Sequence, residues 1–261
     1  MMEGTIRPII YVDSVNYNYL RMKERLKNDF EVFNASNFNE LFNILTWLTP
    51  GLILIDINKQ QDVGFEIIQR VKADLRYNRI PVVILSVEDH EKYVVEAVGL
   101  GAAGFLIKPF TDKELIACLE CNLDKTKRDM IKPTILAVDD NPTILKVVNH
   151  ILSSQYKVYT LNKPTELDVF IENVRPDLFL LDYNMPLMDG FQVLEKLRSN
   201  LQFSNTPIIF LTSEGKEIKI IDALKMGADD YILKPINESL LRKKVAARMV
   251  TVMMNRKNKY W

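Results

Sequence analysis

The chain has 261 residues, of which 48% are hydrophobic, and this is enough apolar material for two cores of about 125 residues each. Its 34 Lys and Arg residues balance 34 Asp and Glu residues, so the sequence lacks the broad basic footprint that nucleic-acid binding usually needs. No stretch has the pattern of a signal peptide, and no apolar run approaches the ~20 residues of a membrane helix. We therefore expect a cytoplasmic protein with no nucleic-acid partner and no membrane partner.

An apolar run in the first half of the chain ends on an acid: residues 54–64 read LIDINKQQDVG, and the run stops at Asp56. A second version, LLDYNMPLMDG, lies 126 residues later and places Asp182 at the same point. The same offset relates further pairs without insertion or deletion: Asp13 and Asp139, Pro81 and Pro207, Ser86 and Thr212, Phe105 and Tyr231, Lys108 and Lys234, and Pro109 and Pro235. A repeat of this length indicates a duplicated domain, because solenoid units run only to about 20 to 50 residues.

Two features lie near the end of the first copy. Cys118 and Cys121 form a C-x-x-C inside the helical pattern TDKELIACLECNL. No helix N-terminus would lower a thiol pKa there, so ordinary helix positions are favoured over a redox site. The polar stretch KTKRDMIKP, residues 125–133, then marks the boundary between a first domain, residues 1–128, and a second domain, residues 129–261.

The second copy alternates short runs rich in Val, Ile and Leu with segments of helical period; the runs are TILAVDD, YKVYTL, LFLLD, PIIFLT and DYILKP. Continuously apolar strands alternating with helices indicate a parallel sheet covered on both faces. Five such units in each copy predict a doubly wound α/β domain with its ligands at the C-terminal ends of the strands. The terminal segment SLLRKKVAARMVTVMMNRKNKYW continues a helix past the domain, and its Met and Val spacing favours a core or a dimer seam.

Five polar residues fall at predicted strand ends of the second copy and should share one site: Asp139, Asp140, Asp182, Thr212 and Lys234. Three carboxylates there would repel one another by about 3 kcal/mol per pair, at ~5 Å and an effective dielectric of ~20. A divalent cation removes this conflict, and oxygen ligands favour Mg²⁺. Lys234 supplies a positive charge and Thr212 a hydroxyl for phosphoryl oxygens, so Asp182 is equipped as a carboxylate nucleophile.

The segments AVDDNPTI, LLDYNMPLMDG, IIFLTSEG and DYILKP, in this order and spacing, resemble the receiver domains of bacterial two-component response regulators, chemotaxis receivers among them. The resemblance covers nearly the whole chain, in two copies. It implies two flavodoxin-like (βα)5 domains with the strand order 2-1-3-4-5. It also implies a phosphoryl donor, either a histidine kinase or a phosphotransfer protein.

The resemblance further implies roles for residues of the second copy. Asp182 is the expected phosphoryl acceptor. The expected Mg²⁺ contacts are those of Asp140 and Asp182 directly, Asp139 through water, and Asn184 through its backbone carbonyl. Lys234 is expected to pair with the phosphate. Thr212 and Tyr231 are expected to form a switch pair. The Lys234–Pro235 bond is expected to be cis.

The first copy keeps five of these positions: Asp56, Asn58, Ser86, Phe105 and Lys108. Asp56 is therefore a candidate second phosphoryl acceptor. Where the second copy has two consecutive acids, the first has Asp13 and Ser14, and a neutral hydroxyl is a poor Mg²⁺ ligand. Asp13 and Asp56 should thus form a weak cation site with Ser14 as its main defect. The loop from Lys59 to Val63 also departs from the pattern. Its Asp62 could lend a carboxylate to the site, although an acid displaced in a loop is more often solvated.

The expected function is signalling by tandem receivers: the protein accepts a phosphoryl group and acts on a downstream protein partner, and it is not expected to be an enzyme. A homodimer is possible. One alternative is the receiver pair that regulates a diguanylate cyclase-type response regulator. A phosphatase of the haloacid dehalogenase type is disfavoured, because that family has a second Asp two residues after its nucleophile and this chain has Asn184. His90 and His150 are expected in a loop or on a helix surface, since neither lies in a helical-bundle pattern.

Overall fold

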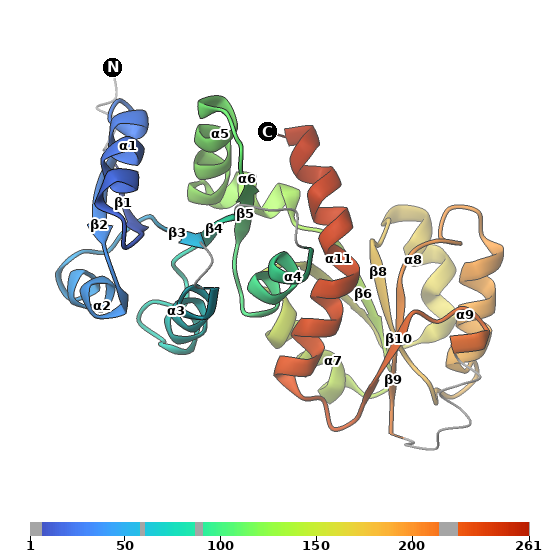
Figure 1. Cartoon of the computed structure of the whole chain (residues 1–261). Helices are drawn as coiled ribbons and strands as arrows, with labels where there is room; N and C mark the ends of the chain where they lie inside the picture. Colours follow the sequence, from blue (N-terminus) through green and yellow to red (C-terminus); the bar gives the residue numbers. More distant parts are fainter. Residues whose placement is uncertain (1–6, 58–60, 87–90, 214–223, 261) are drawn as a thin grey trace. The chain divides into compact units, whose positions relative to one another are not determined.

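Each half of the chain folds around its own five-stranded parallel sheet (Figure 1). The computed structural model describes residues 7–57, 61–86, 91–213 and 224–260. The chain divides into two compact units, Met1–Ile131 and Lys132–Arg256. The boundary expected between residues 128 and 129 falls within helix α6 (Lys125–Ile131), so the polar stretch between the copies is largely helical.

The first sheet contains β1 (Arg7–Val12), β2 (Phe30–Ala35), β3 (Leu52–Ile57), β4 (Val82–Ser86) and β5 (Gly104–Ile107). Its order is β2-β1-β3-β4-β5, and all of its strand pairs are parallel. The helices are α1 (Asn16–Leu26), α2 (Phe38–Trp47), α3 (Gln61–Ala73), α4 (Glu91–Gly99) and α5 (Asp112–Leu123). A helix thus follows each strand, as the long crossover between parallel neighbours requires.

The second sheet contains β6 (Thr134–Val138), β7 (Lys157–Leu161), β8 (Leu178–Asp182), β9 (Ile208–Thr212) and β10 (Asp230–Leu233). Read from the β7 edge, its order is β7-β6-β8-β9-β10. Its helices are α7 (Pro142–Leu152), α8 (Leu167–Asn173) after a short 3-10 turn at Pro164–Glu166, α9 (Gly190–Ser199) and α11 (Glu238–Tyr260). Both sheets therefore have the order 2-1-3-4-5, which confirms the predicted doubly wound fold.

The strands β8 and β9 of the second sheet are buried along their whole length because both faces of the sheet are covered. All five residues of β8 and all five of β9 are buried. These strands consist of apolar residues until their last positions, Asp182 and Thr212. Polar groups therefore collect at the C-terminal edge of the sheet, which is where a doubly wound fold places its ligands.

The remaining expectations about elements are confirmed where the chain is described. Cys118 and Cys121 are buried, free thiols within α5. His150 lies on the exposed side of α7, and His90 falls outside the described residues. The last helix continues past the second domain to Tyr260. Over the described part of the chain, we find no helix with both the length and the apolar character needed to cross a membrane.

Candidate functional site

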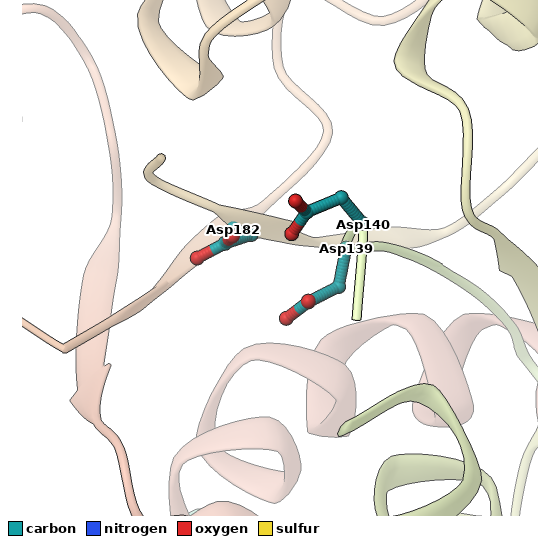
Figure 2. Close-up of side chains that lie close together, drawn as sticks. All are labelled: Asp139, Asp140 and Asp182. Atoms are coloured by element: carbon teal, nitrogen blue, oxygen red, sulfur yellow. The ribbon is translucent and has the colours of Figure 1, made fainter. Parts of the chain in front are cut away.

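Three carboxylates meet at the C-terminal edge of the second sheet (Figure 2). Asp139 and Asp140 directly follow β6, and Asp182 ends β8, the neighbouring strand. One carboxylate oxygen from each of the three lies within 4.8 Å of the others. Asp139 and Asp182 are buried and Asp140 is exposed. The cluster therefore has two members inside the protein and one facing solvent.

Backbone contacts orient the first of these acids. The N–H of Asn141 donates to Asp139 Oδ1 at 2.9 Å. The Asn141 side chain then accepts from the N–H of Thr143 at 2.9 Å and caps α7, with Pro142 in the first turn. A cap of this kind fixes where a helix begins. The carboxylate of Asp139 is thus held by the same short turn that starts α7.

Lys234 brings its ammonium group to both buried acids. Its Nζ lies 2.8 Å from Asp182 Oδ1 and 2.8 Å from Asp139 Oδ2. Burial raises the pKa of Asp182, although the hydrogen bond from Lys234 opposes this effect. Burial favours the neutral form of Lys234, but the contacts with Asp139 and Asp182 outweigh it and raise the pKa of the lysine. The Lys234–Pro235 bond is cis, as predicted.

The donor set of this cluster suits a hard divalent cation. All three side chains offer oxygen, the ligand that Mg²⁺ prefers. Asp139 Oδ2 is buried and pairs with Lys234 Nζ at 2.8 Å, an ammonium group that it shares with Asp182. One lysine leaves net negative charge on three acids. The residues present therefore fit Mg²⁺.

The other expected residues of the site lie at neighbouring strand ends. Thr212 is buried at the end of β9, and its carbonyl oxygen accepts from the N–H of Lys234 at 2.7 Å. Tyr231 of β10 is half-buried, and Nζ of Lys244 on α11 lies 4.9 Å from the centre of its ring. Asn184 is exposed in the loop after β8.

The start of α9 packs closely on the strand that carries Asp182. A Cβ atom at Gly190 would lie 2.4 Å from the carbonyl oxygen of Asp182 and 2.7 Å from the ring of Phe210. Asp189 and Gln192 cap the same helix end reciprocally, each side chain accepting from the other's backbone N–H. The glycine and the cap together hold the loop between Asp182 and α9 close to the sheet.

The first unit brings together fewer of the expected residues. Asp13 follows β1 and is buried, and the side chain of Asp56 in β3 is 2% exposed. Lys108 Nζ lies 2.7 Å from Oδ1 and 2.5 Å from Oδ2 of Asp56. Ser14 is exposed and offers no carboxylate in place of Asp140. Asn58 lies outside the described residues.

The strand ends beside Asp56 repeat the arrangement of the second unit. Ser86 is buried at the end of β4, and Phe105 is buried in β5. The N–H of Lys108 donates to the carbonyl oxygen of Ser86 at 2.8 Å, as that of Lys234 does to Thr212. The two units thus share the backbone frame of the site, and they differ in the side chains around the acids.

Two residues that the sequence analysis does not single out contact the acids of the first unit. The Tyr11 hydroxyl lies 3.0 Å from Asp13 Oδ2 and 2.8 Å from Asp56 Oδ2. Asn18 Nδ2 donates to Asp13 Oδ2 at 2.8 Å. The 126-residue offset could have revealed both residues, because the matching positions of the second copy hold side chains that cannot donate: Ala137 and Ile144.

A cavity of about 340 Å³ borders this first site. Its lining residues are Tyr11, Asn18, Arg21, Met22, Arg25, Asp56, Lys108, Pro109 and Phe110. The carboxylate of Asp56 and the ammonium group of Lys108 therefore border open space even though they are paired with each other.

A family model matches both units. The model of the response regulator receiver domain matches residues 9–120 and residues 135–246. The chain belongs to the response regulator receiver family. Each matched segment contains one of the two sites described above, so the protein contains a pair of receivers; among the described residues, one site has three acids and the other has two.

Named relatives match parts of this receiver pair. Hybrid signal transduction histidine kinase D of Dictyostelium discoideum is 37% identical over 128 residues, which are 49% of this chain and 8% of that protein. Protein RcaC of Microchaete diplosiphon is 29% identical over 178 residues, 68% of this chain and 27% of RcaC. Chemotaxis protein CheY1 of Helicobacter pylori is 32% identical over 114 residues, 42% of this chain and 92% of CheY1. The chain thus spans a small part of the first two relatives.

A solved structure resembles the chain over nearly its whole length. This protein, described as a "probable two-component system response regulator/GGDEF domain protein", aligns with 95% of this chain and 99% of its own, with a TM-score of 0.51 and 20% identity. At this level of identity the likeness concerns the fold alone.

Proposed function

We propose that the protein is a two-component response regulator whose second receiver accepts a phosphoryl group on Asp182 from a histidine kinase or a phosphotransfer protein. The observation that carries the proposal is the position of Lys234 Nζ, 2.8 Å from Asp182 and 2.8 Å from Asp139, beside a third acid, Asp140. A nucleophilic carboxylate, a lysine for the phosphate and a cation site then lie together at one strand edge.

The proposed transfer forms one bond and breaks one. An oxygen of Asp182 forms a bond to phosphorus, while the P–N bond of the donor's phosphohistidine breaks and its electron pair stays on the imidazole nitrogen, which binds a proton. Lys234 is placed to pair with the phosphoryl oxygens, and the Thr212 hydroxyl with another of them. Mg²⁺, held by Asp139, Asp140, Asp182 and the Asn184 carbonyl, would offset the charge between the carboxylate and the incoming phosphoryl group.

The signal would leave the site through Thr212 and Tyr231. A Thr212 hydroxyl that turns toward the phosphoryl group leaves room behind it for the Tyr231 ring. The ring is half-buried beneath Lys244 of α11, so its inward movement changes the surface that β10 and α11 present. We propose that a downstream protein or a second copy of the chain binds this surface, and that the output is a protein contact rather than catalysis.

The proposal is tested by incubating the protein with acetyl phosphate and measuring total acyl-phosphate with and without Mg²⁺. We expect labelling to require Mg²⁺ and to fall strongly in Asp182→Asn, because the nucleophile is lost. The control is Glu195→Gln, an exposed residue of α9, which should label like the wild type. Unchanged labelling of Asp182→Asn would refute the assignment of the acceptor.

A further inference from the structure

The first receiver contains an internal hydrogen-bond donor where its acids meet. Tyr11 lies two residues before Asp13, so both side chains emerge from the same face of β1. Tyr11 is fully buried, and its hydroxyl lies within hydrogen-bond distance of both Asp13 and Asp56. In the second receiver the matching residue is Ala137, whose side chain has no donor, and the group that contacts both acids is the ammonium of Lys234.

The hydroxyl of Tyr11 acts as a donor in this place. A phenol is protonated at neutral pH, whereas an ionised carboxylate can only accept hydrogen bonds, so the hydroxyl donates to the acids. It has one hydrogen and can donate to one carboxylate oxygen at a time, and the shorter distance, 2.8 Å, is to Asp56.

A second donor completes the contrast between the receivers. Asp13 Oδ2 is approached by both the Tyr11 hydroxyl and the Asn18 amide. The matching oxygen of the second receiver, Asp139 Oδ2, pairs instead with the ammonium group of Lys234 at 2.8 Å, and the residues that match Tyr11 and Asn18 there, Ala137 and Ile144, have no side-chain donor. The first receiver has therefore lost an acid at Ser14 and gained two donors, and both changes reduce the need for a cation.

We propose that Tyr11, supported by Asn18, takes the place of the divalent cation in the first receiver and keeps its acid pair closed to metal. The proposal rests on the proposed function in one respect: cation binding by the first receiver is compared with that by the acids of the second receiver, which are proposed to bind Mg²⁺. It changes the expectation about Ser14: restoring an acid there leaves the Tyr11 hydroxyl in place, so Ser14→Asp alone does not restore cation binding.

The cavity beside Asp56 bears on why the first receiver would not be phosphorylated: either its cation site is closed or the approach to its nucleophile is blocked. Asp56 and Lys108 both border this cavity of about 340 Å³, so open space remains beside the nucleophile and its lysine even though Tyr11 also lines the cavity. The Tyr11 hydroxyl reaches both Asp56 and Asp13, which is where a cation would have to meet both acids. The defect proposed here is thus a closed cation site rather than a blocked approach to the nucleophile.

Two backbone amides at equivalent positions of the two receivers allow cation binding at both sites to be followed in one sample. The N–H of Val15 donates to Asp13 Oδ1 at 2.8 Å, and the N–H of Asn141, 126 residues later, donates to Asp139 Oδ1 at 2.9 Å. Mn²⁺ is chosen as the probe because it is paramagnetic and takes the oxygen ligands that Mg²⁺ takes. The full-length protein is titrated with Mn²⁺, and the broadening of both amide signals is followed by NMR.

In the wild type we expect the Asn141 signal to broaden at low Mn²⁺ and the Val15 signal to persist. Ser14→Asp should leave Val15 nearly unchanged. Tyr11→Ala combined with Ser14→Asp should broaden Val15 at a Mn²⁺ concentration at least about tenfold lower than Ser14→Asp alone, the size of one charge-assisted contact. Because alanine leaves a cavity in β1, Tyr11→Phe with Ser14→Asp is measured beside it; it keeps the ring, removes the hydroxyl and should shift Val15 in the same direction.

The outcomes separate this proposal from the proposed function. If Val15 broadens as readily as Asn141 in the wild type, or if Ser14→Asp alone matches both double variants, the role of Tyr11 is refuted. If neither double variant improves on Ser14→Asp, it is refuted as well. Failure of Asn141 to broaden would instead count against the cation site of the second receiver and hence against the proposed function.

Discussion

Lys234 contacts two buried carboxylates, Asp139 and Asp182, and this single side chain holds much of the charge balance of the second receiver. Removing one partner of a buried ion pair leaves the others without compensation. The side chain of Lys234 is 15% exposed, and those of the two acids are 0% and 6% exposed. Water therefore screens these charges weakly, and the lysine is needed for stability as well as for phosphate binding.

We predict that Lys234→Met destabilises the second unit by about 3 kcal/mol in the absence of a divalent cation, and that Mg²⁺ restores part of this loss by binding the acids. Peptide-resolved hydrogen exchange measures the free energy of opening in each unit separately, which a two-domain chain requires. The control is Lys196→Met, because Lys196 and its partner Asp168 are exposed; it should change stability by at most about 0.5 kcal/mol. Equal effects of the two substitutions would contradict the role of Lys234.

At the residue scale, the acids and lysines were predictable and the donors around them were not. An acid that ends an apolar run can be recognised from the amino-acid sequence alone, as at Asp56 and Asp182. The role of Tyr11 depends on how far its hydroxyl reaches from β1, and a tyrosine in a strand is more often a core residue. A comparison of the two copies position by position would have marked it, since alanine and tyrosine differ in volume and in donor capacity.

At the scale of elements, the connection between β8 and α9 fixes the position of the Asp182 backbone. The helix starts at Gly190, where no side chain fits between the carbonyl oxygen of Asp182 and Phe210. In the first receiver the matching glycine is Gly64, where the nearest neighbours of an added Cβ atom would be the Ile57 and Ile55 side chains, at 3.0 Å or more, rather than backbone. The two glycines therefore have different structural importance despite their matching positions.

We predict that Gly190→Ala destabilises the second unit by about 1 to 3 kcal/mol, because the strand backbone must shift to admit the methyl group. It should also reduce acetyl-phosphate labelling, since the shift moves Asp182. The matched control is Gly64→Ala in the first unit, which should cost less because the Ile57 side chain can rotate away and alanine favours the helix. Both are measured by peptide-resolved hydrogen exchange; a cost at Gly64 equal to that at Gly190 would be inconsistent with this packing.

Element types and order were predictable because apolar strands and amphipathic helices differ in period. The five strand runs of the second copy match β6 to β10 within two residues at each end. The polar stretch at residues 125–133 was expected to separate the domains, and most of it forms the helix α6. Charged residues such as Lys and Arg are good helix formers, so polarity alone does not distinguish a surface helix from an irregular linker.

At the scale of the whole molecule, two copies of one fold carry unequal sites. The second receiver has a cluster of three acids whose oxygens suit a divalent cation, and the first has an acid pair that accepts hydrogen bonds from its own tyrosine and asparagine. Under the proposed function, phosphorylation therefore acts through one receiver, and the other supplies a constant surface beside it in the chain.

We predict that beryllofluoride with Mg²⁺, which mimics the phosphoryl group, changes the association state or shape of the wild-type protein. The physical reason is the proposed movement of Tyr231 beneath α11, which alters an exposed surface. Sedimentation velocity and small-angle scattering should differ with and without the reagent, and Asp182→Asn should show no difference. Identical wild-type profiles, with no new partner bound, would argue against a switch of this kind.

The central claim, that the two receivers are chemically unequal, is tested most directly by locating the acyl-phosphate within the wild-type chain. The protein is treated with acetyl phosphate and Mg²⁺, reduced with borohydride, and digested, and the modified fractions of Asp182 and Asp56 are compared in the same sample by mass spectrometry. Because the first receiver lacks one charged ligand, we predict that modification at Asp182 exceeds that at Asp56 roughly ten- to hundredfold. Equal modification of the two residues, or a larger fraction at Asp56, would contradict the account.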